Sequence, residues 1–155
     1  MDLTTQVAKH ARGIFFGDNW TSSGFQQHLA DVTWQQATTK VYSFNTIAAL
    51  LFHVSYYVSE LVKMLRGAPL QARDKLSWET PPIQSQQDWE ALVNKTFTDA
   101  GQLVQLIEKM PEQQLWQYLG EEKYGHFYYN IHGIIEHSHY HLGQIVLIFK
   151  LLQQQ

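Results

Sequence analysis

Apolar residues recur at three- and four-residue intervals along most of the chain, which is the spacing of one face of an α-helix. Four long segments carry this pattern: residues 4–16, 45–66, 85–110 and 130–152. No segment alternates apolar and polar residues as a half-buried strand does. The pattern therefore predicts an all-α fold, a single four-helix bundle domain that spans residues 1–155.

The ends of these segments carry residues that start and stop helices. Gly67 and then Pro69 follow the second segment, and Pro111 follows the third. Glycine favours the turn after a helix, and proline cannot continue one. Ser85, with an acid three residues later at Asp88, has the spacing of a capping box. We therefore expect sharply bounded second and third helices, each followed by a long connection.

The connections carry signals of their own. Residues 17–24 place Trp20 among small polar residues, which indicates either a lid over a site or an anchor that packs the loop onto the body, and we expect the anchor. Asp31 or Thr33 is placed to cap a short helix before the second long one. Residues 70–84 predict an extended connection that crosses the molecule or lines its surface.

Composition narrows the class of protein. The chain has 155 residues, 45% of them hydrophobic and 16% charged, with a formal net charge of −3. Lysine and arginine are scattered and form no basic stripe, which argues against nucleic acid as a partner. There is no cysteine, so disulfides, thiolate ligands and a cysteine nucleophile are all excluded.

The N-terminus and the last apolar segment bear on location. The first ten residues lack the basic and apolar regions of a signal peptide. Residues 134–152 are nearly long enough to span a bilayer, but they contain histidines, Glu136, Gln144 and Lys150, which favour a buried helix. We therefore expect a cytoplasmic protein with no membrane partner.

Four histidines lie within the last predicted helix: His132, His137, His139 and His141. His137 and His141 are four residues apart and share one face, about one turn from each other. At this spacing two imidazoles of one helix can bind the same metal ion. His139 points about 200° away from them around the helix axis. Two imidazoles make a weak site, so a metal centre needs a third ligand from elsewhere.

His53 lies at the margin of the apolar stripe on the second predicted helix. Its spacing alone leaves open whether it faces the core or a groove. Taken singly, a histidine in such a position is typical of a hydrogen-bonded packing residue. Because the chain has no cysteine, any metal must be held by His, Asp or Glu, which suits zinc, nickel, iron or manganese.

Two motifs together carry a family resemblance. The last helix reads His-x-x-x-His-x-Gly-Gln from His137 to Gln144, and the second helix contains Leu-Phe-His-Val around His53. This combination resembles the DinB/YfiT-like superfamily over essentially the whole chain. The resemblance implies a four-helix bundle of that type with long connections. It also implies that His53, His137 and His141 bind one divalent metal ion at one end of the bundle, without His132 or His139.

The resemblance also implies a reaction class, because similar proteins include transferases and isomerases that use a metal-bound, low-molecular-weight thiol. We therefore expect a metal-dependent enzyme with a small-molecule substrate, either a thiol-dependent transferase or a hydrolase. Glu136, Glu60 and Tyr57 are candidate general bases, and Gln144 is a candidate partner for a ligand imidazole or bound water. The alternative is a non-catalytic binding or assembly bundle whose metal is structural or absent. A closed coordination sphere, or a site without an adjoining pocket, would favour that alternative.

The last predicted helix is apolar on more than one face. Ile134, Ile145 and Ile148 follow the histidine side, whereas Ile131 and Leu142 cover other sides. One buried stripe is enough for a helix at the edge of a bundle, so the surplus must be covered within the monomer or by a second copy. We expect a homodimer, since a two-fold contact needs only one self-complementary strip.

Overall fold

The computed structural model describes residues 2–154, and within that range it contains helices and no strand. Four long helices form its body: α1 (Leu3–Phe16), α4 (Ile47–Leu65), α6 (Gln86–Glu108) and α7 (Phe127–Leu152). The expected all-α class is confirmed. The last helix begins three residues before the predicted start at residue 130, because Phe127 and Tyr128 pack against the core and extend its buried face.

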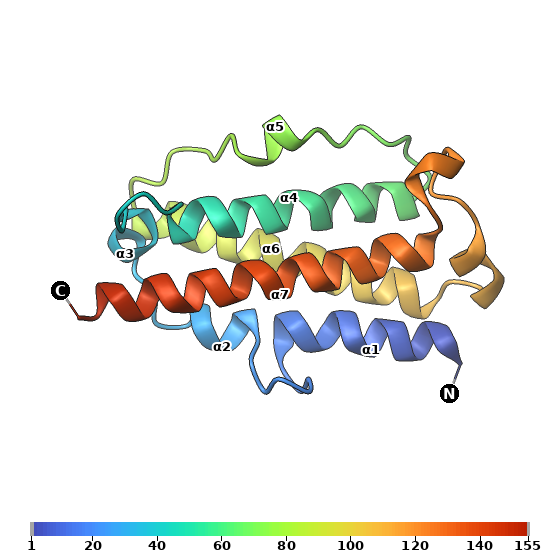
Figure 1. Cartoon of the computed structure of the whole chain (residues 1–155), viewed down its shortest axis with the longest axis horizontal. Helices are drawn as coiled ribbons and strands as arrows, with labels where there is room; N and C mark the ends of the chain where they lie inside the picture. The colour runs from blue at the N-terminus through green and yellow to red at the C-terminus, as the bar shows by residue number, and fades with distance from the viewer. Residues whose placement is uncertain (1, 155) are drawn as a thin grey trace.

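Each long helix packs along two of the others. α4 contacts α6 and α7, and α1 contacts the same two helices from the other side (Figure 1). α4 and α6 run in one direction, whereas α1 and α7 run in the opposite one (Figure 1). Because α4 and α6 are consecutive long helices that point the same way, the chain must return along the length of the molecule between them.

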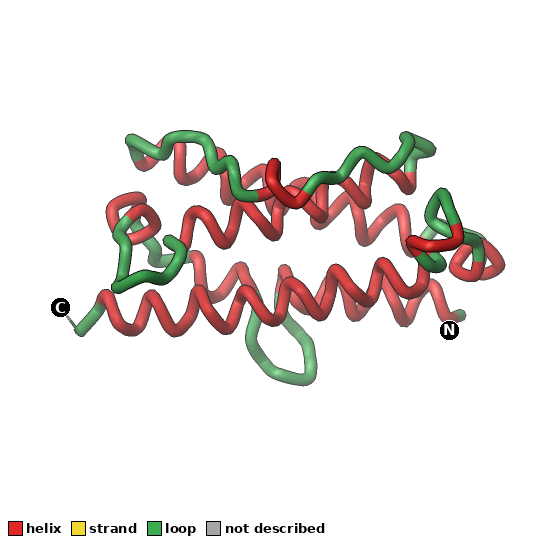
Figure 2. The backbone as a smooth tube through the Cα atoms, turned by 45° about the horizontal axis from the view of Figure 1, so that its top comes forward, coloured by secondary structure: helices red, strands yellow, loops and turns green. Residues whose placement is uncertain are grey.

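Residues 66–85 make this return. They carry the short helix α5 (Asp74–Ser77) over the middle of α4, which it contacts (Figures 1 and 2). The prediction that residues 70–84 cross the molecule is therefore confirmed. Because α4 and α6 run in the same direction, the connecting segment has to cross the molecule, and it does so over α4 (Figure 1).

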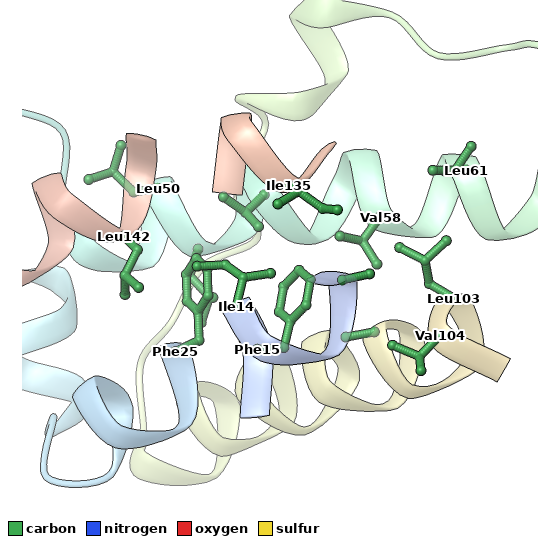
Figure 3. Close-up of a cluster of buried hydrophobic side chains, with 14 of the residues drawn as sticks. Ile14, Phe15, Phe25, Leu50, Val58, Leu61, Leu103, Val104, Ile135 and Leu142 are labelled. Atoms are coloured by element: carbon green, nitrogen blue, oxygen red, sulfur yellow. The ribbon is translucent and has the colours of Figure 1, made fainter. Parts of the chain in front are cut away.

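The four long helices enclose one apolar core, part of which is seen in Figure 3. The stripe predicted on the second long helix faces this core, fully buried at Ile47, Leu50, Leu51, Val54, Val58, Leu61 and Val62 and partly buried at Leu65. α1 contributes Ile14 and Phe15, and α7 contributes Ile135 and Leu142 (Figure 3). Each such side chain contributes about 1.5–3 kcal/mol on burial. This core determines how α4 and α7 face each other.

The first long helix is short for the bundle, and a second helix completes its row. α2 (Phe25–Leu29) follows α1 nearly end to end, beyond a loop at residues 17–24 that bulges outward (Figure 1). The rings of Phe15 and Phe25 stack across the interruption, with centroids 5.4 Å apart. Packing of these two rings therefore joins α1 to α2.

The expectation that Trp20 anchors the loop at residues 17–24 is wrong, because its side chain is 99% exposed. Asn19 ties the loop down in its place. Its Nδ2 donates to the carbonyl oxygens of Gly13 and Ser23, at 2.7 and 2.8 Å, and its Oδ1 accepts from the backbone N–H of Thr21. The loop is therefore held by hydrogen bonds from a polar side chain to the backbone, and not by an apolar side chain as expected.

Helix starts follow the capping signals, with one difference. Thr33 and Gln36 form a complete capping box at α3 (Trp34–Thr38), which settles the choice between Asp31 and Thr33. Ser85 accepts from the backbone N–H of Asp88 at the start of α6, as expected. The Asp88 carboxylate accepts mainly from the backbone N–H of Gln84, one residue before the cap, at 2.9 Å. The acid therefore stabilises the residue before the cap.

The connection between α6 and α7 contains two 3₁₀ helices, η1 (Glu112–Trp116) and η2 (Glu122–Tyr124).

By length and composition alone, α4 is the one described helix that could cross a bilayer. Of its most apolar 18-residue stretch, 61% is buried inside the fold. Core helices of water-soluble proteins pass the same test, so this finding is weak evidence for a membrane span.

Candidate metal centre

The three candidate ligands come from two helices that pack against each other. His53 lies on α4, and His137 and His141 lie on successive turns of α7. His53 and His141 are buried, with exposed fractions of only 4% and 6%. The sequence placed His53 at the margin of its stripe, and the structure turns it towards α7. The family resemblance implied a site at one end of the bundle. The structure places the three histidines near the middle of α7 instead.

The imidazoles converge through their Nε2 atoms. His137 Nε2 lies 3.0 Å from His53 Nε2 and 3.1 Å from His141 Nε2. One ligand nitrogen from each of the three residues lies within 4.8 Å of the others. Metal–nitrogen bonds of about 2.0–2.1 Å at tetrahedral angles place neighbouring nitrogens about 3.3 Å apart. The cluster is therefore close to the spacing that one small divalent ion requires.

A hydrogen-bond chain sets the tautomer of His53. Its Nδ1 lies 2.7 Å from the Ser77 hydroxyl, and that hydroxyl donates its only proton to the carbonyl oxygen of Asp74 at 2.6 Å. Because the Ser77 proton is already used, the His53 Nδ1 must donate its own proton to the Ser77 oxygen. The His53 Nε2 is then left with a free lone pair that faces the other two rings.

The same argument applies to His141. Its Nδ1 lies 2.7 Å from Gln144 Oε1, a carbonyl oxygen that can only accept. Nδ1 therefore carries the proton, and Nε2 presents a lone pair to the centre. Of the two partners predicted for Gln144, the structure shows the imidazole of a candidate ligand. At least two nitrogen lone pairs point at one place, which is unfavourable unless a proton or a cation lies between them.

Burial keeps these imidazoles neutral. Desolvation, followed by the nearby His141 and His53, lowers the pKa of His137 to about 4. Desolvation also lowers the pKa of His53 and of His141. Metal ions bind neutral imidazole, so these shifts keep the cluster in its ligating form at neutral pH.

Aromatic rings enclose the cluster on its outer side. Trp78, at the end of α5, stacks on the His53 ring with centroids 3.8 Å apart and planes inclined by 17°. The Tyr57 ring meets both His53 and His137 edge-on, at 5.2 Å from each. The Tyr57 hydroxyl donates to Asp74 Oδ1 at 3.0 Å. The connecting segment thus forms one wall of the site and orients a phenol beside it.

A cavity of about 510 Å³ opens next to the three imidazoles. α7 contributes most of its wall, including Ile134 and Tyr140, while Tyr57 comes from α4 and Asp74 from α5. Gly133, one turn before His137, also lies in the wall, and its missing side chain leaves room there. A coordination sphere beside such a space is open to a small molecule.

The candidate bases fall into two groups. Tyr57 and Glu136 line the cavity together with the histidines. Glu60 does not: it faces a neighbouring hollow and pairs with Lys63 at 2.6 Å. The structure therefore excludes Glu60 from the site and brings the other two residues to it.

The two remaining histidines of α7 lie away from the cluster, as expected. His139 lines a separate cavity beside His10 of α1. His132 packs against Tyr128, with ring centroids 4.4 Å apart, and is 6.3 Å from His10. Neither residue can reach the ion site.

Sequence reasoning missed three residues of the site: Asp74, Ser77 and Trp78. All three belong to the segment that crosses over α4, and nothing in the spacing of that segment refers to a histidine 24 positions earlier. The available signal was weak: a serine, an acid and a tryptophan clustered within an otherwise extended connection.

No family model, curated protein or solved structure matches this chain. The resemblance to the DinB/YfiT-like superfamily therefore stays a prediction. The evidence for a candidate metal site is the geometry of the three histidines.

Replacing Ser77 by alanine is expected to weaken metal binding about 10–100-fold, because the acceptor that holds His53 in its ligating tautomer is lost. Calorimetric titration of the metal-free protein with zinc measures the affinity. Ser138→Ala is the matched control: Ser138 is buried beside His137, and its hydroxyl has no hydrogen-bond partner among residues 2–154. Equal weakening in both variants would show that the Ser77 hydroxyl has no specific role.

The lowered pKa of His137 predicts an acid-sensitive metal-free protein. Between the ordinary value of 6.5 and about 4, the unfolded chain binds a proton that the folded chain does not. The free energy of unfolding should therefore fall as the pH drops through that window and be insensitive to this group above it. Urea unfolding in the presence of a chelator measures the profile. His137→Gln should flatten it, and an unchanged slope in that variant would contradict the assignment.

Proposed function

We propose that the protein is a metal-dependent enzyme that binds one divalent ion through His53, His137 and His141 and acts on a small molecule. The observation that carries the proposal is the convergence of three imidazole Nε2 atoms, 3.0 and 3.1 Å apart in successive pairs, beside an open cavity. Membership of the DinB/YfiT-like superfamily, as a four-helix bundle of that type, is part of the same proposal. Its support is the motif and the order of the helices.

The donor set fits such an ion. Three neutral imidazoles suit zinc, nickel or iron, and they suit manganese less well without a carboxylate. Two of them are held in the ligating tautomer by Ser77 and Gln144, which is the outer-shell support that metal-binding histidines usually have. Three protein ligands leave at least one coordination position open, as in catalytic sites.

A divalent ion bound there would supply Lewis acidity and lower the pKa of a coordinated water or thiol. The chain's own residues do the rest. Ser77 and Gln144 orient the imidazoles, and Trp78 covers His53 and restricts access of water to it. Tyr57 holds a proton on its phenolic oxygen, directed at Asp74 Oδ1, within the same cavity. Glu136, an exposed acid that lines that cavity and has no ion pair with a basic side chain within residues 2–154, is our preferred general base.

The reaction is proposed as group transfer to or from a low-molecular-weight thiol, or as hydrolysis. In both, the ion would supply the nucleophile as a bound thiolate or hydroxide, since the chain has no cysteine thiolate to offer. The alternative is a non-catalytic bundle with a structural metal. The cavity of about 510 Å³ beside the cluster favours the enzyme, because a structural site needs no such opening. A cytoplasmic location, without nucleic-acid or membrane partners, belongs to the proposal on the composition alone.

A homodimer is also part of this proposal, but the isoleucines of α7 do not support it. Ile131, Ile145 and Ile148 are buried within the monomer, so they are not available to a second copy. The support comes from exposed apolar side chains in the connection just before α4 and on α7: Tyr42 (81%), Phe44 (46%) and Leu147 (55%). Phe44 and Leu147 line one shared hollow.

Sedimentation at micromolar concentration should detect a species of twice 18.1 kDa. Leu147→Glu should shift the protein towards the monomer, because a charge in a two-fold contact meets its own copy. A wild-type protein that sediments only as an 18.1 kDa species would rule out the dimer.

Purified without a nickel column, the protein is expected to contain about one divalent ion per chain. His141→Ala should lose most of this metal, because two imidazoles bind a labile ion weakly at neutral pH. His139→Ala is the matched control, since His139 lines a different cavity two residues away on the same helix. Elemental analysis measures both variants. Equal metal in wild type and His141→Ala, or equal loss in the two variants, would overturn the site.

A further inference from the structure

The cavity beside the histidines is one-sided in charge. Asp74 and Glu136 line it, and no lysine or arginine does so in the described part of the chain. Neither carboxylate forms an ion pair with a basic side chain within residues 2–154. Arg73 and Lys75 flank Asp74 in sequence but do not line the cavity. The space that a substrate would enter therefore presents negative charge without a positive counterpart from the protein.

The same cavity is lined by aromatic rings. Tyr57 forms part of the inner wall, beside His53 and His137. Tyr129 and Tyr140, both on α7, are largely exposed and lie at the edge. Aromatic faces attract organic cations, and carboxylates beside them add Coulomb attraction. A cavity lined by phenols and carboxylates, without basic side chains, suits a ligand with an ammonium group.

The charge of the ion has to be included. A divalent ion on three neutral imidazoles brings two positive charges, which Asp74 and Glu136 offset. When the ion also holds a thiolate, the site as a whole carries a net negative charge. The remainder of a bound molecule then lies among carboxylates and tyrosines, so a positive group there is favoured over a negative one.

Resting on the proposed metal-dependent function, we propose that this cavity selects small molecules that carry a positively charged ammonium group close to the atom that reaches the histidines. It disfavours thiols with anionic tails. Asp74 and Glu136 are the residues that determine this specificity. The absence of basic side chains is as important to it as the presence of the two acids.

Three short thiols test the charge preference while keeping the coordinating atom the same. Cysteamine has a cationic tail, 2-mercaptoethanol a neutral one and 3-mercaptopropionate an anionic one. Binding to the cobalt-loaded protein is followed by the sulfur-to-cobalt absorption band. The ratio of cysteamine to 3-mercaptopropionate affinity is measured in wild type and in the double variant Asp74→Asn, Glu136→Gln. Intrinsic differences in thiol acidity cancel when the two ratios are compared.

The ratio should be at least about tenfold higher in wild type than in the double variant, on the scale of two nearby charges at a partly solvated site. Glu79→Gln is the matched control: Glu79 is an exposed acid of the same connecting segment, outside the cavity. It should keep the wild-type ratio. The double variant retains an acceptor for the Tyr57 hydroxyl, so its metal content should match that of wild type, and this is verified first.

The outcomes separate the two proposals. Thiols that bind with the same charge ratio in wild type and double variant would overturn the ammonium preference and leave the open metal site standing. Failure of every thiol to bind metal-loaded protein would count against the proposed function. In that case choline and its uncharged isostere 3,3-dimethyl-1-butanol, titrated into metal-free protein and followed by shifts of the tyrosine ring signals, decide the charge preference. Equal binding of these two would overturn it.

Discussion

The hydrogen bond between His53 and Ser77 is the interaction on which the rest of the site depends. It joins α4 to α5, so the position of the connecting segment and the tautomer of a ligand are set by the same contact. Ser77 is itself fixed, because its proton goes to the carbonyl oxygen of Asp74. With α5 held there, Trp78 lies flat on the imidazole and the Asp74 side chain reaches Tyr57.

The topology explains why a connecting segment lies over the site. α4 and α6 run in the same direction, so the chain between them must cover the length of the molecule (Figure 1). A crossing segment of that kind is bound to lie on some face of the bundle. Here it lies over α4 and supplies Asp74, which lines the cavity, and Trp78, which stacks on His53. Function on a connection held by a rigid scaffold is a common arrangement.

The electrostatics of the site follow from burial and from the choice of lining residues. Burial lowers the histidine pKa values and keeps the rings neutral, and neutral rings can share a cation but cannot attract an anion. The nearby charges are carboxylates on α5 and α7. In our proposal, the affinity of the cluster for an ion and its preference among ligands would therefore depend on one small group of residues.

The sequence by itself determined the long helices and the shared face of two of the three candidate ligands. Helical periodicity and capping are local, so the pattern was enough to predict α4 and α6, the shared face of His137 and His141, and Gln144 as a partner for a ligand imidazole or a bound water. Tertiary structure decided everything that joins distant segments. It turned His53 from the margin of its stripe towards α7, placed Ser77 against it and laid Trp78 flat on its ring. Such contacts depend on how helices and connections pack in space, and no spacing along the chain records that packing.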